Sequence, residues 1–180
     1  MSDPILSVAV AEDAALLADL HLRSWRVAYR GVLPDAYLDG NCAAQMHDKW
    51  QQRMAAPAGE YVICIARVDG EAAGFVCLQP GFLPEQGIYL DNLHVLPAWQ
   101  GCGLGKLLLA WAAALLQRHW TGQALLLHVL DDNQPARQVY RRLGGMETKL
   151  PDEVMADGVQ VKVSQVTWQD VPALLLRLQS

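Results

Sequence analysis

Alternating apolar and polar residues mark the strands in the first half of the chain. A weak alternation from Ile5 to Val10 predicts a first strand. Two stronger segments follow, Tyr61 to Val68 and Ala72 to Leu78, and the Asp69-Gly70 pair between them is typical of a tight hairpin turn. The pattern therefore predicts an antiparallel pair of strands joined by this turn.

Three further strands are predicted in the second half. The segment from Gly87 to Val95 is closed by Pro97, which cannot donate to a strand ladder. Leu125 to Leu130 is almost entirely apolar, which is typical of a strand buried at the centre of a sheet. Asp157-Gly158 predicts a last hairpin, which leads into a strand from Val159 to Trp168.

Helical spacing of apolar residues occupies much of the remaining chain. A helix is expected to begin near Glu12-Asp13, where acidic side chains suit the helix dipole, and to run to about Tyr29. A second helical stretch is predicted through Leu38 and Met46 to Trp50. Further along, the spacing of one helix face recurs at Leu104, Leu107, Leu108, Trp111 and Leu115.

The last predicted helix has clear boundary signals. Asn133 is a suitable N-cap, Pro135 is tolerated in the first turn, and Gly144-Gly145 ends the helix. No internal repeat, low-complexity tract or linker divides the chain, so the elements predict one mixed sheet with helices on its faces. A length of 180 residues fits one domain, which we expect to cover residues 1–180.

Composition narrows the class of partner. Apolar residues make up 52% of the chain and charged residues 18%, which is typical of a globular protein. The formal net charge of -5 argues against nucleic acid or an anionic membrane as partner and suits a cationic one, such as an amine. Neither a basic, apolar leader nor a membrane-spanning run is evident, so we expect a cytoplasmic protein. The cysteines form no C-x-x-C pair, which argues against a metal site or a redox motif.

A glycine cluster, Gln100-Gly101-Cys102-Gly103-Leu104-Gly105, lies between a predicted strand and a predicted helix. Unpaired backbone N–H groups at such a helix start bind phosphate well, and glycines let an anion approach the main chain. The P-loop pattern fails, because Gln100 stands at its first glycine and Leu107 follows Lys106. The dinucleotide fingerprint fails as well, since no glycine occupies position 106.

The remaining pattern, Q-x-x-G-x-G after V-x-P, resembles the acyl-CoA pyrophosphate loop of the GNAT superfamily of N-acetyltransferases. A second segment of that family has the form V-x-x-x-N-x-x-A-x-x-x-Y-x-x-x-G. Its positions are matched in register here by Val129, Asn133, Ala136, Tyr140 and Gly144. The two segments together cover roughly residues 87–146. The resemblance implies an α/β fold with a mixed, largely antiparallel central sheet and helices on both faces.

The resemblance also implies acetyl-CoA as co-substrate and no metal. In the family, main-chain groups of the strand before the loop hold the pantetheine arm, and the loop holds the pyrophosphate. For His94 and Cys102 only the main chain is expected to contribute. The cofactor-binding residues implied are Leu93, His94, Val95, Gln100, Gly101, Cys102, Gly103, Leu104, Gly105, Lys106, Asn133 and Tyr140.

Amine acylation by a thioester requires proton transfers, because an alkyl amine with a pKa near 10 is only about one part in a thousand neutral at pH 7. Tyr140 matches the family tyrosine that protonates the leaving thiolate; its alternative role is packing under the cofactor. The family's usual glutamate base is replaced by Tyr89. His128 and Asp91 are the substitutes, and either residue can instead be structural, with a water chain carrying the proton.

These residues support two classes of function. The first is an enzyme that transfers acetyl from acetyl-CoA to a primary amine by direct attack on the thioester, with a small molecule or a peptide as acceptor. The alternative is a catalytically silent acyl-CoA-binding module, suggested by Tyr89. Trp25 and Tyr29 can line an acceptor pocket or pack in the core. The apolar segment Val171–Leu178 can pack on its own domain or against a second chain, as in a homodimer.

Overall fold

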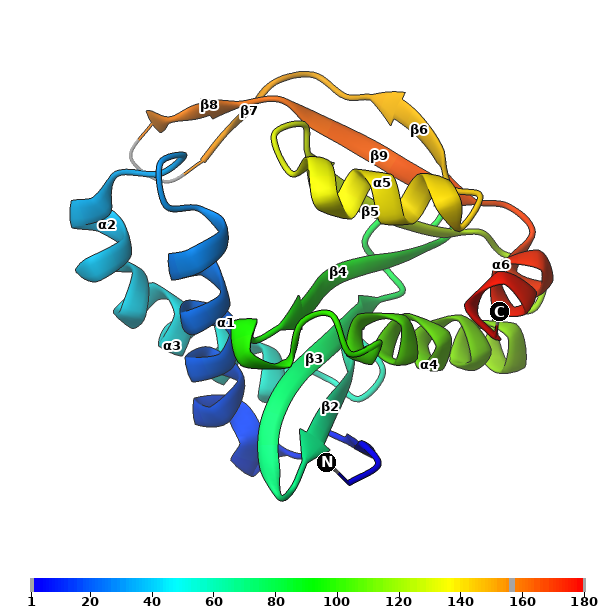
Figure 1. The fold of residues 1–180 in the computed structure, drawn as a ribbon, viewed down its shortest axis with the longest axis horizontal. Coiled ribbons are helices and arrows are strands. Elements are labelled where there is room, and N and C mark those ends of the chain that lie inside the picture. Colours follow the sequence, from blue (N-terminus) through cyan, green and yellow to red (C-terminus); the bar gives the residue numbers. More distant parts are fainter. Residues whose placement is uncertain (1, 156–157, 180) are drawn as a thin grey trace. The chain divides into compact units, whose positions relative to one another are not determined.

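A computed structural model describes residues 2–155 and 158–179 (Figure 1). The helices are α1 (Ala14–Ala28), α2 (Asp35–Asp39), α3 (Cys42–Met54), α4 (Leu104–His119), α5 (Gln134–Arg142) and α6 (Val171–Gln179), with the 3-10 turns η1 (Ala11–Asp13) and η2 (Pro97–Trp99). The strands are β1 (Ile5–Val8), β2 (Val62–Val68), β3 (Glu71–Gln79), β4 (Ile88–Val95), β5 (Leu125–Leu130), β6 (Met146–Lys149), β7 (Glu153–Val154), β8 (Gln160–Val161) and β9 (Val163–Trp168).

Seven of these strands form one sheet in the order β1-β2-β3-β4-β5-β9-β6, and β7 and β8 form a separate pair. β4 and β5 are parallel, whereas β5 pairs antiparallel with β9, β9 with β6, and β1 with β2. The predicted mixed, largely antiparallel α/β class is confirmed. The nearly continuous apolar sequence of β5 predicted a central strand, and β5 lies inside the sheet between β4 and β9.

The chain contains two compact units, one of Met1–Cys77 with Asn92–Leu108 and one of Leu78–Asp91 with Leu109–Ser180. We call them unit 1 and unit 2. The chain passes between them within β3, β4 and α4. The single domain expected over residues 1–180 stays a prediction.

Unit 1 contains a hairpin and a helix pair. Asp69 and Gly70 both have positive φ, 52° and 84°, so the turn between β2 and β3 has the left-handed geometry that twisted hairpins favour, as predicted. α1 packs against α3. α1 buries His21 and Ser24, whereas Ala28 near its end is exposed. Polar side chains at these positions have partners in the interior, described below.

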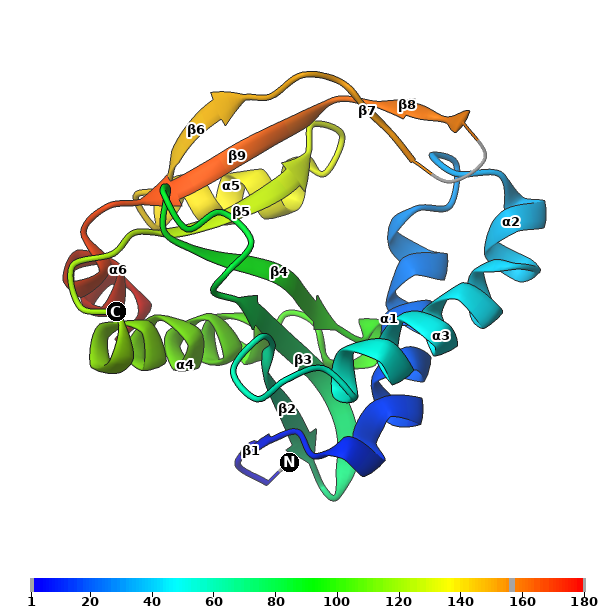
Figure 2. The same ribbon diagram turned by 180° about the vertical axis from the view of Figure 1, so that it is seen from behind.

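Unit 2 contains α5, which lies across β5 and β9 in both views (Figure 1 and Figure 2). Asn133 caps α5 as predicted, its Oδ1 accepting a hydrogen bond from the Ala136 N–H at 3.3 Å. Gly144, with φ of 80°, follows the end of the helix. α6 buries Val171, Leu174 and Leu178 within the chain.

One expectation about regular structure was wrong in detail. The strand expected over residues 159–168 is divided at Lys162 into β8 and β9, which belong to different sheets. The Lys162 carbonyl accepts a hydrogen bond from the Asp131 N–H at 2.8 Å, which extends the register of β5 with β9 by one residue. Asp157 of the predicted hairpin turn lies outside the described residues. On α4, Leu107, Trp111 and Leu115 are only half-buried. The buried stripe consists of Leu104, Leu108, Leu109, Ala112, Ala113 and Leu116.

Candidate active site

The glycine loop of unit 1 connects η2 to the 16-residue helix α4. Gly101 and Gly103 have φ of 78° and 86°, a conformation that L side chains rarely adopt, and a Cβ at either position would have no heavy atom within 4 Å. Gly105 is different, because it lies in the helix, and its Cβ would make only an ordinary contact with Val95. The first amide groups of α4 have no carbonyl ahead of them in the helix. An open, left-handed loop before such amides is a suitable cradle for an anion.

Polar side chains of the loop bond to nearby main chain. Gln100 Nε2 donates to the Val95 carbonyl at 3.0 Å, which ties the loop to the end of β4. The exposed Cys102 thiol donates to the Trp99 carbonyl at 2.8 Å. Lys106 is exposed in the first turn of α4, whereas Leu104 is buried.

The end of β4 has one main-chain edge turned away from β3. The Leu96 N–H donates to the Ala73 carbonyl of β3 at 2.9 Å. Because successive residues of a strand direct their main-chain groups to opposite edges, the N–H groups of Leu93 and Val95 face the other edge. The register with β5 covers only the first three residues of β4, Ile88–Leu90. An extended ligand can therefore pair with the end of β4.

The His94 side chain belongs to a polar network that the sequence did not indicate. Its Nδ1 lies 2.9 Å from Ser24 Oγ on α1, and its Nε2 lies 3.5 Å from Asn92 Nδ2. Arg53 of α3 donates to Asn92 Oδ1 at 3.0 Å, which fixes the amide orientation and makes Nδ2 the group that faces His94. His94 Nε2 is therefore an acceptor, and Nδ1 carries the proton.

A second histidine, His21 of α1, contacts the His94 ring with a centroid separation of 4.7 Å. It is completely buried, and its Nδ1 accepts a hydrogen bond from the indole N–H of Trp50 at 3.1 Å. An indole only donates, so the His21 proton is on Nε2, which has no hydrogen-bond partner among the described residues. Burial lowers the pKa of His21 well below its usual value, and the charges of His94, Lys49 and Arg53 lower it further.

The aromatic residues of unit 1 divide between core and half-buried positions. Trp50 is fully buried, as expected for core packing. Trp25 of α1 and Tyr29, which follows the end of this helix, are half-buried, with ring centroids 4.6 Å apart. Burial raises the pKa of Tyr29. These two rings provide apolar surface beside Ser24.

Unit 2 brings together two of the residues that the sequence analysis discussed for proton transfer. The Tyr89 ring, almost buried, lies edge-on to the His128 imidazole with centroids 5.0 Å apart. His128 Nδ1 lies 3.8 Å from Glu153 Oε1, and His128 Nε2 is buried with no hydrogen-bond partner among the described residues. Asp91 is a half-buried residue of β4, two positions after Tyr89.

Tyr140 lies in the last turns of α5 and is half-buried. Its ring packs edge-on against Trp168, with centroids 5.7 Å apart. Asn133, the other α5 residue expected to bind cofactor, uses its side-chain oxygen as the helix cap. Of the predicted residues, unit 2 therefore contains Asp91, His128, Asn133 and Tyr140, whereas unit 1 contains the loop and the end of β4.

Two arginines of α5 pair with Glu147 of β6. Arg137, only 8% exposed, forms an ion pair with Glu147 and donates to the Asp131 carbonyl at 2.7 Å. Arg141 contacts the other Glu147 oxygen at 3.0 Å. The hydrogen bond from Arg137 is the main reason that the pKa of Glu147 is lowered. Both guanidinium groups are thus engaged within the protein.

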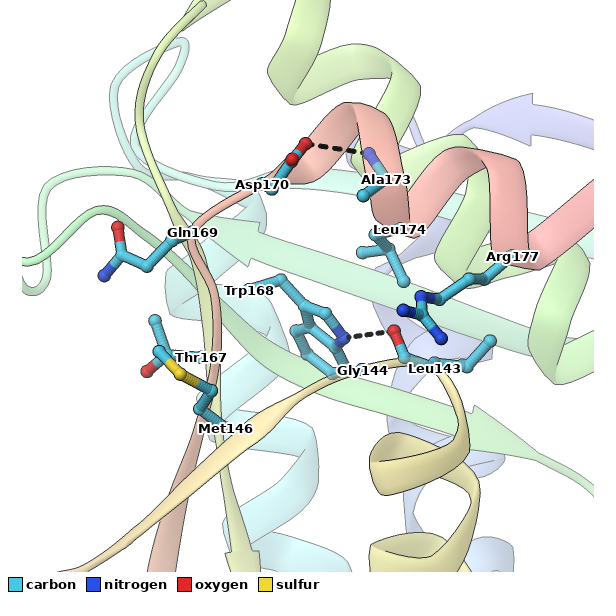
Figure 3. A pocket seen from close by; sticks show the side chains of 10 residues that line it. All are labelled: Leu143, Gly144, Met146, Thr167, Trp168, Gln169, Asp170, Ala173, Leu174 and Arg177. Atoms are coloured by element: carbon cyan, nitrogen blue, oxygen red, sulfur yellow. Dashed lines mark hydrogen bonds between the residues drawn. The ribbon is translucent and has the colours of Figure 1, made fainter.

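A pocket of about 230 Å³ lies at the start of α6 (Figure 3). Its residues are Leu143, Gly144, Met146, Thr167, Trp168, Gln169, Asp170, Ala173, Leu174 and Arg177. The Trp168 indole donates to the Leu143 carbonyl at 3.1 Å, and Asp170 caps α6 through the Ala173 N–H. None of the predicted site residues lines this pocket, so it is distinct from the chemistry considered above.

Other classes of site are not supported in the described part of the chain. Residues 2–155 and 158–179 contain no group of three His, Cys, Asp or Glu side chains that could hold a metal ion. Over the same residues, no helix is both long and apolar enough to cross a bilayer.

Comparison with known proteins identifies the class. The family model described as Acetyltransferase (GNAT) family matches residues 19–145. The uncharacterized N-acetyltransferase YuaI of Bacillus subtilis (strain 168) is 26% identical over 168 residues, which cover 92% of this chain and 93% of that protein. The chain therefore belongs to the GNAT acetyltransferase family, and the resemblance found in the sequence is confirmed.

Solved structures agree on the fold. PaiA N-acetyltransferase from Thermoplasma acidophilum, in complex with coenzyme A, is similar with a TM-score of 0.72 at 16% identity, over 93% of this chain and 100% of that one. YncA, a putative acetyltransferase from Salmonella typhimurium with its cofactor acetyl-CoA, is similar with a TM-score of 0.66 at 16% identity, over 93% and 94% of the two chains.

Proposed function

We propose that this protein transfers acetyl from acetyl-CoA to a primary amine. The observation that carries the proposal is the loop at Gly101 and Gly103, whose left-handed backbone leaves open space beside unpaired amides at the start of α4. The loop fits a pyrophosphate, and the edge at the end of β4 that faces away from β3 fits a pantetheine arm. Family membership and relatives with bound coenzyme A or acetyl-CoA support the same donor.

Acetyl-CoA supplies an activated acetyl thioester when it binds. The loop amides and Lys106 would bind its phosphates, and the main chain of Leu93–Val95 would align its arm. The Val95 N–H would then stabilise the negative charge that develops on the thioester oxygen.

His128 accepts the proton that the attacking amine loses, through its buried Nε2, and Asp91 is the second candidate for this role. The amine nitrogen bonds to the acetyl carbon, and the bond from that carbon to sulfur breaks. Tyr140 gives its hydroxyl proton to the departing thiolate. The Tyr89 ring, at the position of the usual glutamate, packs against His128. Small amines and peptide N-termini are both acceptors of suitable chemistry.

The test begins with calorimetric titration of acetyl-CoA into the wild-type protein and a Gly103→Glu variant. Gly59→Glu is the matched control, because Gly59 also has positive φ, 88°, and open space around its Cβ. We expect micromolar binding by the wild type and the control, and loss of binding in Gly103→Glu. Absence of wild-type binding would refute the donor assignment.

A second step separates the enzyme from a silent acyl-CoA-binding module. Release of free CoA is followed with acetyl-CoA and a panel of small amines and peptides, for wild type and Tyr140→Phe. We expect turnover with at least one acceptor and about a 100-fold lower kcat in the variant. Binding without turnover on any amine would favour the silent module.

A further inference from the structure

We propose that Glu153 is a positioning residue for His128, so that the two side chains act as a carboxylate–imidazole pair; this rests on the proposed function, in which His128 accepts the amine proton. Glu153 lies in β7, within the short sheet of β7 and β8, and has no counterpart among the residues that the sequence indicated.

The strand connections bring the two residues together. Glu153 pairs with Val161 in β8. β9 begins two residues later and pairs with β5, with Gln165 opposite His128. One continuous segment of chain therefore sets the position of Glu153 relative to His128.

At 3.8 Å the contact is electrostatic rather than a hydrogen bond, and it favours one position for the imidazole proton. Glu153 Oε1 lies 3.8 Å from His128 Nδ1, and an ionised carboxylate can only accept. The proton on a neutral His128 is therefore favoured on Nδ1. The lone pair is then on Nε2, which is buried and has no hydrogen-bond partner among the described residues.

Two other features suit this pairing to proton transfer. The His128 side chain is 21% exposed and that of Glu153 is 52% exposed, so the carboxylate is the more hydrated group and the imidazole is partly shielded. The Tyr89 ring, on the neighbouring strand β4, packs edge-on with the imidazole ring and limits its movement. When Nε2 takes a proton, the positive charge forms beside a carboxylate, which stabilises it.

The tautomer of His128 tests the inference without relying on turnover. Long-range ¹H–¹⁵N correlation spectra of the full-length protein above pH 7.5 report which nitrogen is protonated, and His128→Gln identifies the signal. We expect the Nδ1–H form in the wild type and a shift toward the Nε2–H form in Glu153→Gln. Asp152→Asn removes the same charge one residue away, at an exposed position before β7, and should leave the tautomer unchanged.

Kinetics with the best acceptor from the amine panel give the second readout. We expect kcat to fall about 5-fold in Glu153→Gln with KM for acetyl-CoA unchanged. Asp152→Asn should match the wild type. A wild-type Nε2–H tautomer, or equal effects of the two substitutions, would overturn the inference. An Nδ1–H tautomer in a protein whose His128→Gln variant is fully active would instead reject His128 as the base, and the pairing would stand.

Discussion

The histidines of the two units differ in the partners that surround them. In unit 1, His94 faces an amide N–H at Nε2, and His21 faces an indole N–H at Nδ1. Each acceptor nitrogen therefore already has a donor partner. In unit 2, His128 has a carboxylate near Nδ1 and a buried Nε2 without a partner among the described residues.

The comparison shows that burial alone does not indicate a proton acceptor. His21 is the most buried of the three rings, yet the indole occupies its acceptor nitrogen, and protonation would break that bond. A donor partner makes a histidine structural, whereas a carboxylate partner prepares it to accept a proton. Four experiments test this distinction.

The largest expected effect is on catalysis, through a pair of matched substitutions. In His128→Gln we expect kcat/KM to fall at least about 100-fold, because the proton acceptor is lost. In His94→Gln the shape of the pH–rate profile should stay that of the wild type, since neither His94 nitrogen exchanges protons with substrate. Steady-state CoA release across pH 5.5–9 measures both. A flattened profile in His94→Gln would reverse the assignment.

The next effect is on stability. His21→Ala leaves a cavity and an unpaired Trp50 indole N–H in the core of unit 1, which should lower the free energy of unfolding by about 3 kcal/mol. His47→Ala is the control, because the His47 side chain is 57% exposed, and it should change the stability little. Urea unfolding at pH 7.5, followed by tryptophan fluorescence, compares them. Equal losses would mean that His21 is not a packing residue.

The pH dependence of stability follows from the lowered pKa of His21. The unfolded chain binds a proton below about pH 6.5, whereas folded His21 does not until its lower pKa is reached. Above about pH 6.5, His21 therefore does not change the free energy of unfolding. Between about pH 6.5 and its lower pKa in the folded state, it lowers the free energy of unfolding by up to about 1.4 kcal/mol per pH unit. Urea midpoints at pH 7.5, 6.0 and 5.0 should decline less steeply in His21→Phe than in the wild type. Parallel curves would contradict the assigned protonation state.

The smallest effect concerns Ser24. Ser24→Ala removes the oxygen that accepts from His94 Nδ1, and we expect about 1 kcal/mol lower stability in urea unfolding. Glu153→Gln, at a half-exposed carboxylate, should leave stability within about 0.5 kcal/mol of the wild type. The Ser24–His94 contact of unit 1 would then contribute to stability, and the Glu153–His128 pair of unit 2 to the catalytic rate. A larger loss of stability in Glu153→Gln than in Ser24→Ala would contradict this distinction.

Features that depend on near neighbours in the sequence were predictable. The turn at Asp69-Gly70 and the Asn133 cap are local choices of backbone geometry, and both were confirmed. The glycine loop and the α5 segment identified the family, because their spacing reflects one binding mode. The roles of Tyr140, His128 and Asp91 stay predictions.

Features that depend on distant contacts were not predictable. Ser24 and His94 are 70 residues apart, and no periodicity links them. His128 and Glu153 come together through the pairing of β5 with β9 and of β7 with β8, which the sequence pattern does not specify. The ion pair of Arg137 with Glu147 likewise depends on how β6 folds back beside α5. The sequence alone therefore does not show that the Arg137 guanidinium has a partner within the protein.

Arg137 also links elements that would otherwise open separately. From the middle of α5 it holds the Asp131 carbonyl, before the helix, and the Glu147 carboxylate, after it. A helix of nine residues has little stability by itself. Unfolding either end of α5 would break a contact of the Arg137 side chain. The amide hydrogens of α5 and β6 should consequently exchange with solvent in one cooperative opening, and the helix that carries Tyr140 has the lifetime of the sheet beside it.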